Sequence, residues 1–349
     1  MVGKGRLLRG LFVLVALAGV PAALAAEMTP HERQLYEAAK AGGETVTWYV
    51  SQHTTETAEA IGRAFREKHP GVGVNVVRST AQVAYQRLSQ DLRAGVTQCD
   101  VFSSTDPSHA VELKKQGLLL HYLPENQARV VEAFRGGDPD GYYHTTQVGL
   151  VAITYNSKLV PESEAPRNWT DLLDPKWKDQ VAVGHPGFSG RVGNWVVAMR
   201  KLYGWGYFEK LEKNKPQIGR SIVDTVTMLN AGERKVAAGS VNSTRPSIAK
   251  GNPIAIVYPT DGALLMEDPS AILKSSRNPN AARLFMEFLL GVEKSQLVVE
   301  DGGESMRPEV KLPPDYPPLD RIKTFRVPLD EVAEGIPEVI EMWRDLFGI

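Results

Sequence analysis

One stretch near the start of the chain, residues 44–55 (ETVTWYVSQHTT), constrains the fold more than any other. Residues 45–50 are β-branched or aromatic, which favours a buried strand. Ser51, Gln52 and His53 follow, and Thr54 or Thr55 can cap a helix that begins there. A strand that leads into a helix N-terminus directs backbone N–H groups toward a crevice, where open α/β sheets bind ligands. The stretch therefore predicts a binding corner at a sheet edge.

The same order of strand, polar corner and helix recurs further along the chain. Residues 72–77 predict a strand that leads into Ser79 and Thr80, and residues 99–102 predict another that leads into residues 103–106. Three such units in succession indicate a parallel sheet with right-handed crossovers.

A second α/β series follows a long predicted strand at residues 147–155. Its predicted strands are residues 180–184, 236–239 and 254–258, with residues 271–274 favouring one more. Two further corners precede helices in this series, one at Ser189 and Gly190 and one at residues 242–245. Two series joined by long strands predict an α/β protein with two lobes around a cleft, each lobe a mostly parallel sheet flanked by helices.

The first residues differ from the rest of the chain. Lys4, Arg6 and Arg9 precede an apolar run at residues 11–20 and a small-residue cleavage site at residues 23–25. This order is typical of a cleavable signal peptide, and the apolar run is too short for a comfortable membrane span. We therefore expect export to the periplasm.

The predicted organisation has three parts. Residues 1–25 form the signal peptide, and residues 26–150 form lobe 1, to which part of residues 262–306 returns. Residues 151–261 form lobe 2, on which the C-terminal helix of residues 307–349 packs.

Charge and cysteine content exclude several classes of protein. The formal net charge of the 349 residues is −1, which argues against a nucleic-acid or anionic-membrane partner. Cys99 is the only cysteine, so no intrachain disulfide is possible, and its apolar setting predicts a buried, inert thiol.

The candidate ligand-binding residues are mostly neutral hydrogen-bonding side chains at the predicted corners, joined by two arginines and two acids. Arg191 and Arg245 could each clamp a carboxylate or phosphate, and Asp106 and Asp261 are placed to face an amine or a metal. Each polar corner residue alone is also explained as a helix cap or a turn residue, and either arginine as a solvated helix residue. The full set is Ser51, Gln52, His53, Ser79, Thr80, Ser104, Thr105, Asp106, Ser189, Gly190, Arg191, Asn242, Ser243, Thr244, Arg245 and Asp261.

The sequence offers no pattern for catalysis or for a resident metal. It contains no HExxH or CxxC-type zinc motif and no GxSxG nucleophile motif. We therefore expect a protein without cofactor, metal or enzymatic activity. An exported enzyme on the same fold is the alternative from another class, and it would need an activated nucleophile or an acid/base pair in the cleft.

Six segments together carry a resemblance to a known family: WYVSQH, CDVFSST with the AVELKKQGLL helix, GLVAITYNSKL, WTDLLDPKWKDQVAV, LNAGE and AILKSSRNPNAARLFMEFLLG. The chain resembles periplasmic solute-binding proteins of ABC importers, in the extracellular family that includes ferric-ion, phosphonate, thiamine and sugar-phosphate binders. The resemblance implies a two-lobed, hinged periplasmic binding protein fold (type II). It also implies a monomer that closes on solute and docks on an ABC permease in the inner membrane.

The resemblance also divides the ligand classes. His53 matches the histidine that ferric-ion binders of the family place after the first strand, but Thr105 stands where they have an acid, with Asp106 next. Residues 239–245 contain no tyrosine where they have an adjacent pair, whereas the anion-contacting Ser189 and Gly190 are retained. Because ferric iron prefers anionic oxygen ligands, we expect a phosphorylated, phosphonate or carboxylate solute. The alternatives are ferric iron held by His53 with a synergistic anion, and a sensor that presents solute to a chemoreceptor.

Overall fold

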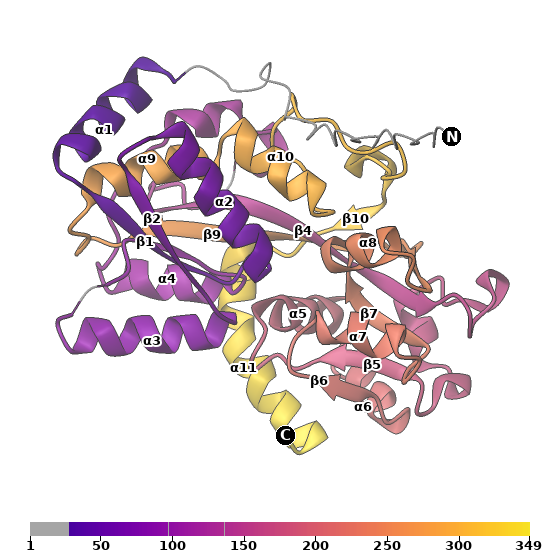
Figure 1. Ribbon diagram of the computed structural model, residues 1–349. Coiled ribbons are helices and arrows are strands. Elements are labelled where there is room, and N and C mark those ends of the chain that lie inside the picture. The colour runs from indigo at the N-terminus through magenta and orange to yellow at the C-terminus, as the bar shows by residue number, and fades with distance from the viewer. Residues whose placement is uncertain (1–27, 97, 136) are drawn as a thin grey trace, which may run out of the picture.

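The computed structural model describes residues 28–96, 98–135 and 137–349 (Figure 1). The predicted signal peptide lies outside the described residues. Among the residues that are described, no helix is both long enough and apolar enough to cross a membrane.

The first part of the chain alternates helices and strands, as the repeated corners predict. Its elements are α1 (Pro30–Ala41), β1 (Thr45–Val50), α2 (Thr55–Lys68), β2 (Gly73–Arg78), α3 (Ala81–Arg93), β3 (Val101–Ser103) and α4 (Pro107–Lys115). Each strand is short and each helix begins directly after a polar corner, so the corners of all three units face the same sheet edge.

The second part begins with a long buried strand and continues as a second α/β series. Its elements are β4 (Tyr143–Asn156), β5 (Val181–Gly184), α5 (Gly190–Tyr203), α6 (Gly206–Lys213), β6 (Gln217–Gly219), α7 (Asp224–Asn230), β7 (Val236–Ser240), α8 (Val241–Ala249), β8 (Ile254–Val257), β9 (Ala263–Ile272), α9 (Pro279–Leu289), α10 (Val292–Glu300), β10 (Thr324–Phe325) and α11 (Leu329–Phe347). Short 3-10 helices lie at Glu125–Arg129, Glu132–Phe134, Glu162–Glu164, Trp169–Leu173, Pro175–Trp177 and Leu319–Arg321.

The strands join in the order β2-β1-β3-β9-β4-β7-β5-β6. The outer trios, β2-β1-β3 and β7-β5-β6, are parallel, whereas β9 and β4 pair antiparallel with each other and with their outer neighbours. At the margins, β10 pairs parallel with β9 and β8 pairs antiparallel with β4. Two parallel units are therefore linked by two long crossing strands, and the predicted α/β class is confirmed.

Each half has its own core, and the last helix, α11, packs against both halves. In the first half, Phe285 of α9 packs edge-on against Trp48 of β1, with ring centroids 5.1 Å apart. In the second half, Trp195 of α5 packs edge-on against Phe208 of α6 at 5.6 Å. Helix α11 runs between the halves and packs against α5 on one side and α4 on the other (Figure 1).

Three local predictions differ from the structure. Strand β9 begins at Ala263 rather than near residue 271, and α6 and α10 were not predicted. The sequence Glu267, Asp268, Pro269 is typical of a turn, but Pro269 lies opposite Thr145, next to a register shift in β4. A proline is tolerated at such an irregularity because no ladder hydrogen bond is lost.

The predicted corner at residues 242–245 is also different. It lies inside α8, whose N-cap is Ser240, so these residues occupy the first turns of the helix rather than a loop before it. Cys99 is buried, as predicted, and burial raises the pKa of its thiol well above the ordinary value.

Candidate functional site

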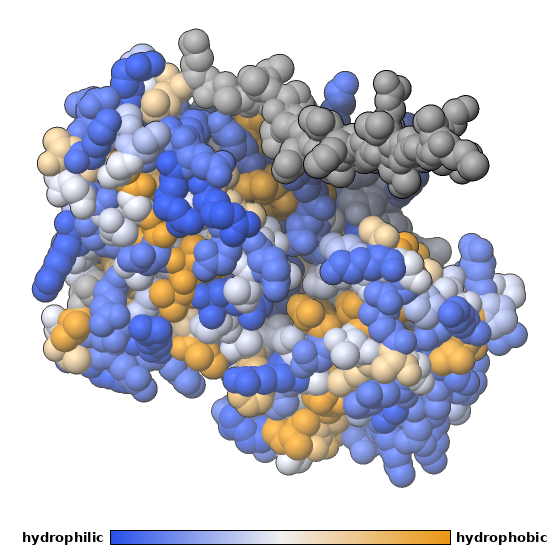
Figure 2. All heavy atoms as spheres, in the orientation of Figure 1, coloured by the Kyte–Doolittle hydropathy of each residue, from blue (hydrophilic) through white to orange (hydrophobic). Residues whose placement is uncertain are grey.

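A cleft lies between the two halves, and residues from both halves line it. Figure 2 shows the halves meeting along an indentation on the viewed face. The cleft has a volume of about 80 Å³, which suits a small solute. Its lining consists of Ser51, Gln52, His53, Thr54, Thr57, Arg78, Thr80, Ala81, Thr105, Gln147, Phe188, Ser189, Arg191, Ser221, Ile222, Val223, Asn242, Ser243, Val298, Asp301 and Gly303.

The beginnings of five helices contribute to this lining. Thr54, Thr80, Ser189 and Val223 are the N-caps of α2, α3, α5 and α7, and Asn242 lies in the first turn of α8. Helix N-termini carry partial positive charge and unpaired N–H groups. Their convergence from both halves makes the cleft favourable for negative charge.

Several polar atoms in the lining have no protein partner. The buried atoms His53 Nε2, Thr80 Oγ1, Arg191 Nε and Asn242 Oδ1 make no hydrogen bond within the described part of the chain. The side chains of Thr80 and Ser189 also do not cap their own helices. Because buried polar groups are almost always hydrogen-bonded, these atoms are available to a ligand.

Three cations surround His53. Burial, followed in order of size by the charges of Lys294, Arg191 and Arg78, lowers the pKa of His53 well below its usual value. His53 is therefore neutral at physiological pH. Arg78, at the end of β2, donates from Nε to the His53 carbonyl oxygen at 3.0 Å and remains partly exposed to solvent. It forms no ion pair with the described residues, so its charge can serve a solute.

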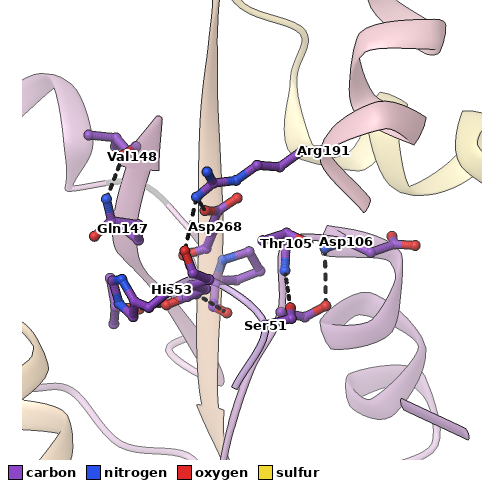
Figure 3. Close-up of polar contacts among 12 residues, drawn as sticks. Ser51, His53, Thr105, Asp106, Gln147, Val148, Arg191 and Asp268 are labelled. Carbon is purple, nitrogen blue, oxygen red and sulfur yellow. Dashed lines mark hydrogen bonds and ion pairs between the residues drawn. The ribbon is translucent and has the colours of Figure 1, made fainter. Parts of the chain in front are cut away.

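Arg191 connects the halves (Figure 3). From α5, its Nη2 donates to Asp268 Oδ2 of β9 at 2.7 Å and to the Gln52 carbonyl oxygen of the first half at 3.2 Å. Burial raises the pKa of the Asp268 carboxyl, and Arg191 and Lys294 oppose that shift. Much of the Arg191 charge is therefore already balanced by the protein.

Lys294 lies behind the lining, in α10. Its Nζ donates to the Thr146 carbonyl oxygen at 2.5 Å and to Gln147 Oε1 at 2.7 Å. Burial lowers the pKa of Lys294 to about 7, with Asp268 opposing the shift. Gln147 lines the cleft, so Lys294 positions a lining side chain from behind.

The structure brings nine of the predicted site residues together in the lining. They are Ser51, Gln52, His53, Thr80, Thr105, Ser189, Arg191, Asn242 and Ser243. The Ser51 hydroxyl accepts from the Thr105 backbone N–H at 3.0 Å (Figure 3), which fixes two corners of the first half relative to each other.

Four other predicted residues lie just behind these corners. Ser104 bonds His109 Nδ1 at 2.9 Å, and Asp106 caps α4 by accepting from Ser108 N at 2.9 Å. The Ser79 hydroxyl lies 3.5 Å from the Thr80 carbonyl oxygen. Gly190 packs its Cα against the peptide between Thr105 and Asp106, so that a Cβ there would lie 2.5 Å from backbone atoms.

The remaining three predicted residues make their contacts outside the cleft lining. Arg245 pairs with Glu304 at 2.6 Å and contacts Tyr258, Thr244 donates to the Ser240 carbonyl oxygen at 2.8 Å, and Asp261 accepts from Trp169 N and from Tyr203 OH. None of the three lines the cleft.

Several lining residues were absent from the predicted set. Arg78 carried a usable signal, because it directly precedes the predicted corner at Ser79. Asp301 and Gln147 carried none, since the first follows the unpredicted α10 and the second lies within the long strand β4. Within the described residues, no three side chains of His, Cys, Asp or Glu gather as a metal site would require.

The chain is similar to several known proteins. The family described as "Bacterial extracellular solute-binding protein" matches residues 46–303. A putative 2-aminoethylphosphonate-binding periplasmic protein of Salmonella typhimurium is 22% identical over 79% of this chain and 84% of its own. The major ferric iron-binding protein of Neisseria meningitidis is 25% identical over 83% and 89%.

A solved structure with the same fold is the periplasmic binding protein AfuA from Actinobacillus pleuropneumoniae, bound to fructose-6-phosphate. Its TM-score is 0.78 at 21% identity, and the match covers 88% of this chain and 99% of that one.

Proposed function

The chain belongs to the family of bacterial extracellular solute-binding proteins, the periplasmic binding components of ABC importers, and we propose that it captures a small anionic solute between its halves. The solute is a phosphorylated, phosphonate or carboxylate compound. One observation carries the proposal: unpartnered polar atoms and the beginnings of five helices converge on one cleft from both halves. An anion placed there receives hydrogen bonds that the protein leaves open.

Capture follows from the same geometry. Arg78 supplies the least compensated positive charge, and the Thr80 and Ser189 hydroxyls supply donors from opposite halves. A neutral His53 with its proton on Nε2 donates to an oxyanion without bringing further charge. Closure of the halves replaces the solute's water with these fixed donors, as hinged binding proteins do.

Ferric iron is the competing ligand, because several relatives are named for it and His53 Nε2 has no partner among the described residues. The lining offers one carboxylate, Asp301, and no tyrosine among the described residues. Hard ferric iron prefers several anionic oxygen ligands, so this lining favours the organic anion.

We further propose where the protein acts and to which partner it delivers the solute. The mature protein is a periplasmic monomer, exported through the predicted signal peptide, that delivers solute to an inner-membrane permease. The named relatives are binding proteins, two of them called periplasmic, and binding without turnover is the function proposed here.

The test uses Arg78→Gln, with Arg344→Gln on the exposed face of α11 as the matched control. Isothermal titration of ligand-free protein with phosphonates, phosphate esters and carboxylates should show binding that Arg78→Gln weakens about tenfold, the scale of a charged hydrogen bond. The control should bind like the native protein. Equal affinity in Arg78→Gln and the control, or heat with ferric ion alone, would overturn the proposal.

A further inference from the structure

The lining of the cleft contains groups of both charges. Arg78, His53 and Arg191 form its basic part, where Arg78 contacts the His53 carbonyl oxygen, and burial followed by the Arg191 charge lowers the pKa of Arg78. Asp301, the only carboxylate among the described residues of the lining, lies beside the first turn of α2, where the Thr57 hydroxyl donates to it. Positively charged donors and a carboxylate acceptor therefore both lie near the start of α2.

Asp301 has no cationic partner. Among the described residues it forms no ion pair, although it is partly buried at the end of α10. Burial raises the pKa of its carboxyl and the Thr57 hydrogen bond opposes that shift. Glu56 and Lys250 act on it only from a distance. A half-buried carboxylate without a counter-charge is costly unless a ligand supplies one.

A second acceptor lies beside it. The turn that carries Asp301 and Gly303 borders Asn242 of α8, because a Cβ on Gly303 would lie 3.2 Å from Asn242 Nδ2. The buried Asn242 Oδ1 has no partner within the described chain. Two acceptors, one from each half, thus line the cleft on adjoining segments. An ammonium group, with three donors and one positive charge, satisfies both.

We propose that Asp301 and Asn242 form a subsite for an ammonium group, so that the solute is a small zwitterion whose anionic group lies toward Arg78. This inference rests on the proposed function, since it adds a second charged group to the anionic solute. It also gives the single acid in the lining a role that a purely anionic solute would not use, because a carboxylate beside such a solute would repel it.

The test compares solutes that differ only in an amino group. Ligand-free native protein is titrated with ethylphosphonate and 2-aminoethylphosphonate, with ethyl phosphate and phosphoethanolamine, and with propionate and β-alanine. In the pair whose anionic group binds, the amino compound should bind about tenfold more tightly or better, the scale of a charged hydrogen bond. Asp301→Asn should remove that ratio and change the affinity for the compound without the amino group by about threefold at most.

A second variant keeps the test decisive if Asp301→Asn folds poorly. Asn242→Asp adds a carboxylate on the adjoining segment and should raise the ratio between the paired solutes, because it strengthens attraction only for the ammonium. Thermal unfolding of both variants controls for loss of structure.

The possible results separate the two claims. Equal affinity within every pair that binds would overturn the ammonium subsite and leave the anion proposal standing. An unchanged ratio in both variants would overturn it as well. If no solute in the panel binds, the proposed function fails and the subsite fails with it.

Discussion

The starts of α5 and α8 look alike in sequence and serve different purposes. Each carries a small polar segment followed by an arginine, and each arginine is buried and paired with a carboxylate, Arg191 with Asp268 at 2.7 Å and Arg245 with Glu304 at 2.6 Å. Arg191 lines the cleft, and its Nε has no partner in the described part of the chain, whereas Arg245 does not line the cleft. The two arginines differ in the location of the carboxylate with which each is paired.

Asp268 belongs to a crossing strand, so its arginine is drawn toward the junction of the halves. Glu304 belongs to the turn after α10, and Tyr258 and Tyr316 enclose the Arg245 guanidinium, whose carbon lies 4.2 Å from the Tyr316 ring centroid. An arginine after a polar corner thus predicts a buried charge, but the surrounding elements decide whether that charge faces a ligand.

The largest expected effect lies at the enclosed arginine. Arg245→Ala should cost about 3–5 kcal/mol of unfolding free energy, because it leaves the Glu304 carboxylate, 1% exposed, without a counter-charge. The folded fraction should bind solute normally. Chemical denaturation measures the loss, and the double variant Arg245→Met with Glu304→Met should recover much of it. Weaker solute binding at native stability would show that Arg245, like Arg191, serves the cleft.

The next effect concerns contact between the halves at the start of α5. In Gly190→Ala the new Cβ would lie 2.5 Å from the backbone of Thr105, so the halves cannot approach as closely. We expect about tenfold weaker solute binding, within the cost of overpacking, and little change in melting temperature.

The matched control is Gly206→Ala at the start of α6, where a Cβ would have only the end of the Glu209 side chain nearby, at 4.0 Å. Small-angle scattering should show that Gly190→Ala stays more extended with solute than the native protein. Native affinity in Gly190→Ala would mean that this contact is not needed for binding.

The smallest effect is a pH dependence of stability that arises at Lys294, which lies behind the lining near Asp268, the partner of Arg191. The pKa of Lys294 falls from its ordinary 10.5 to about 7 on folding. Between these values the unfolded chain holds a proton that the folded chain has released, so stability rises with pH. The Lys294 contribution should be about 1 kcal/mol between pH 7 and pH 8.

Denaturation of native protein and Lys294→Met at both pH values isolates this contribution as a difference. A difference that does not change with pH would show that Lys294 keeps its proton in the folded protein.

The sequence predicts strands and helices where the local pattern agrees with the fold. Strand β1 is predicted at the bounds it has, because it has a continuous pattern and clear ends, whereas the C-terminal helix predicted for residues 307–349 occupies only Leu329–Phe347. Most of strand β9 is not predicted, because Asp268 and Pro269 are typical of a turn unless their partners are known. These partners are Arg191 and the irregularity in β4. Both partners are distant in sequence.

For the candidate site, too, the sequence predicts best the residues whose position is set by the local pattern. Corners directly after short strands, such as Ser51 and Thr80, reach the lining because strand ends share one sheet edge. Asp261 and Arg245 do not, since neither burial among aromatic rings nor a distant carboxylate can be inferred from neighbouring residues. Asp301 enters the lining from a helix that the local pattern did not predict.

The most direct test of the anionic-solute account is native mass spectrometry of the protein released from the periplasm, beside its Arg78→Gln variant. The account predicts one bound organic molecule that carries a phosphate, phosphonate or carboxylate group and is depleted in the variant. A neutral molecule, a ferric ion alone, or equal retention of the anion by both proteins would contradict it.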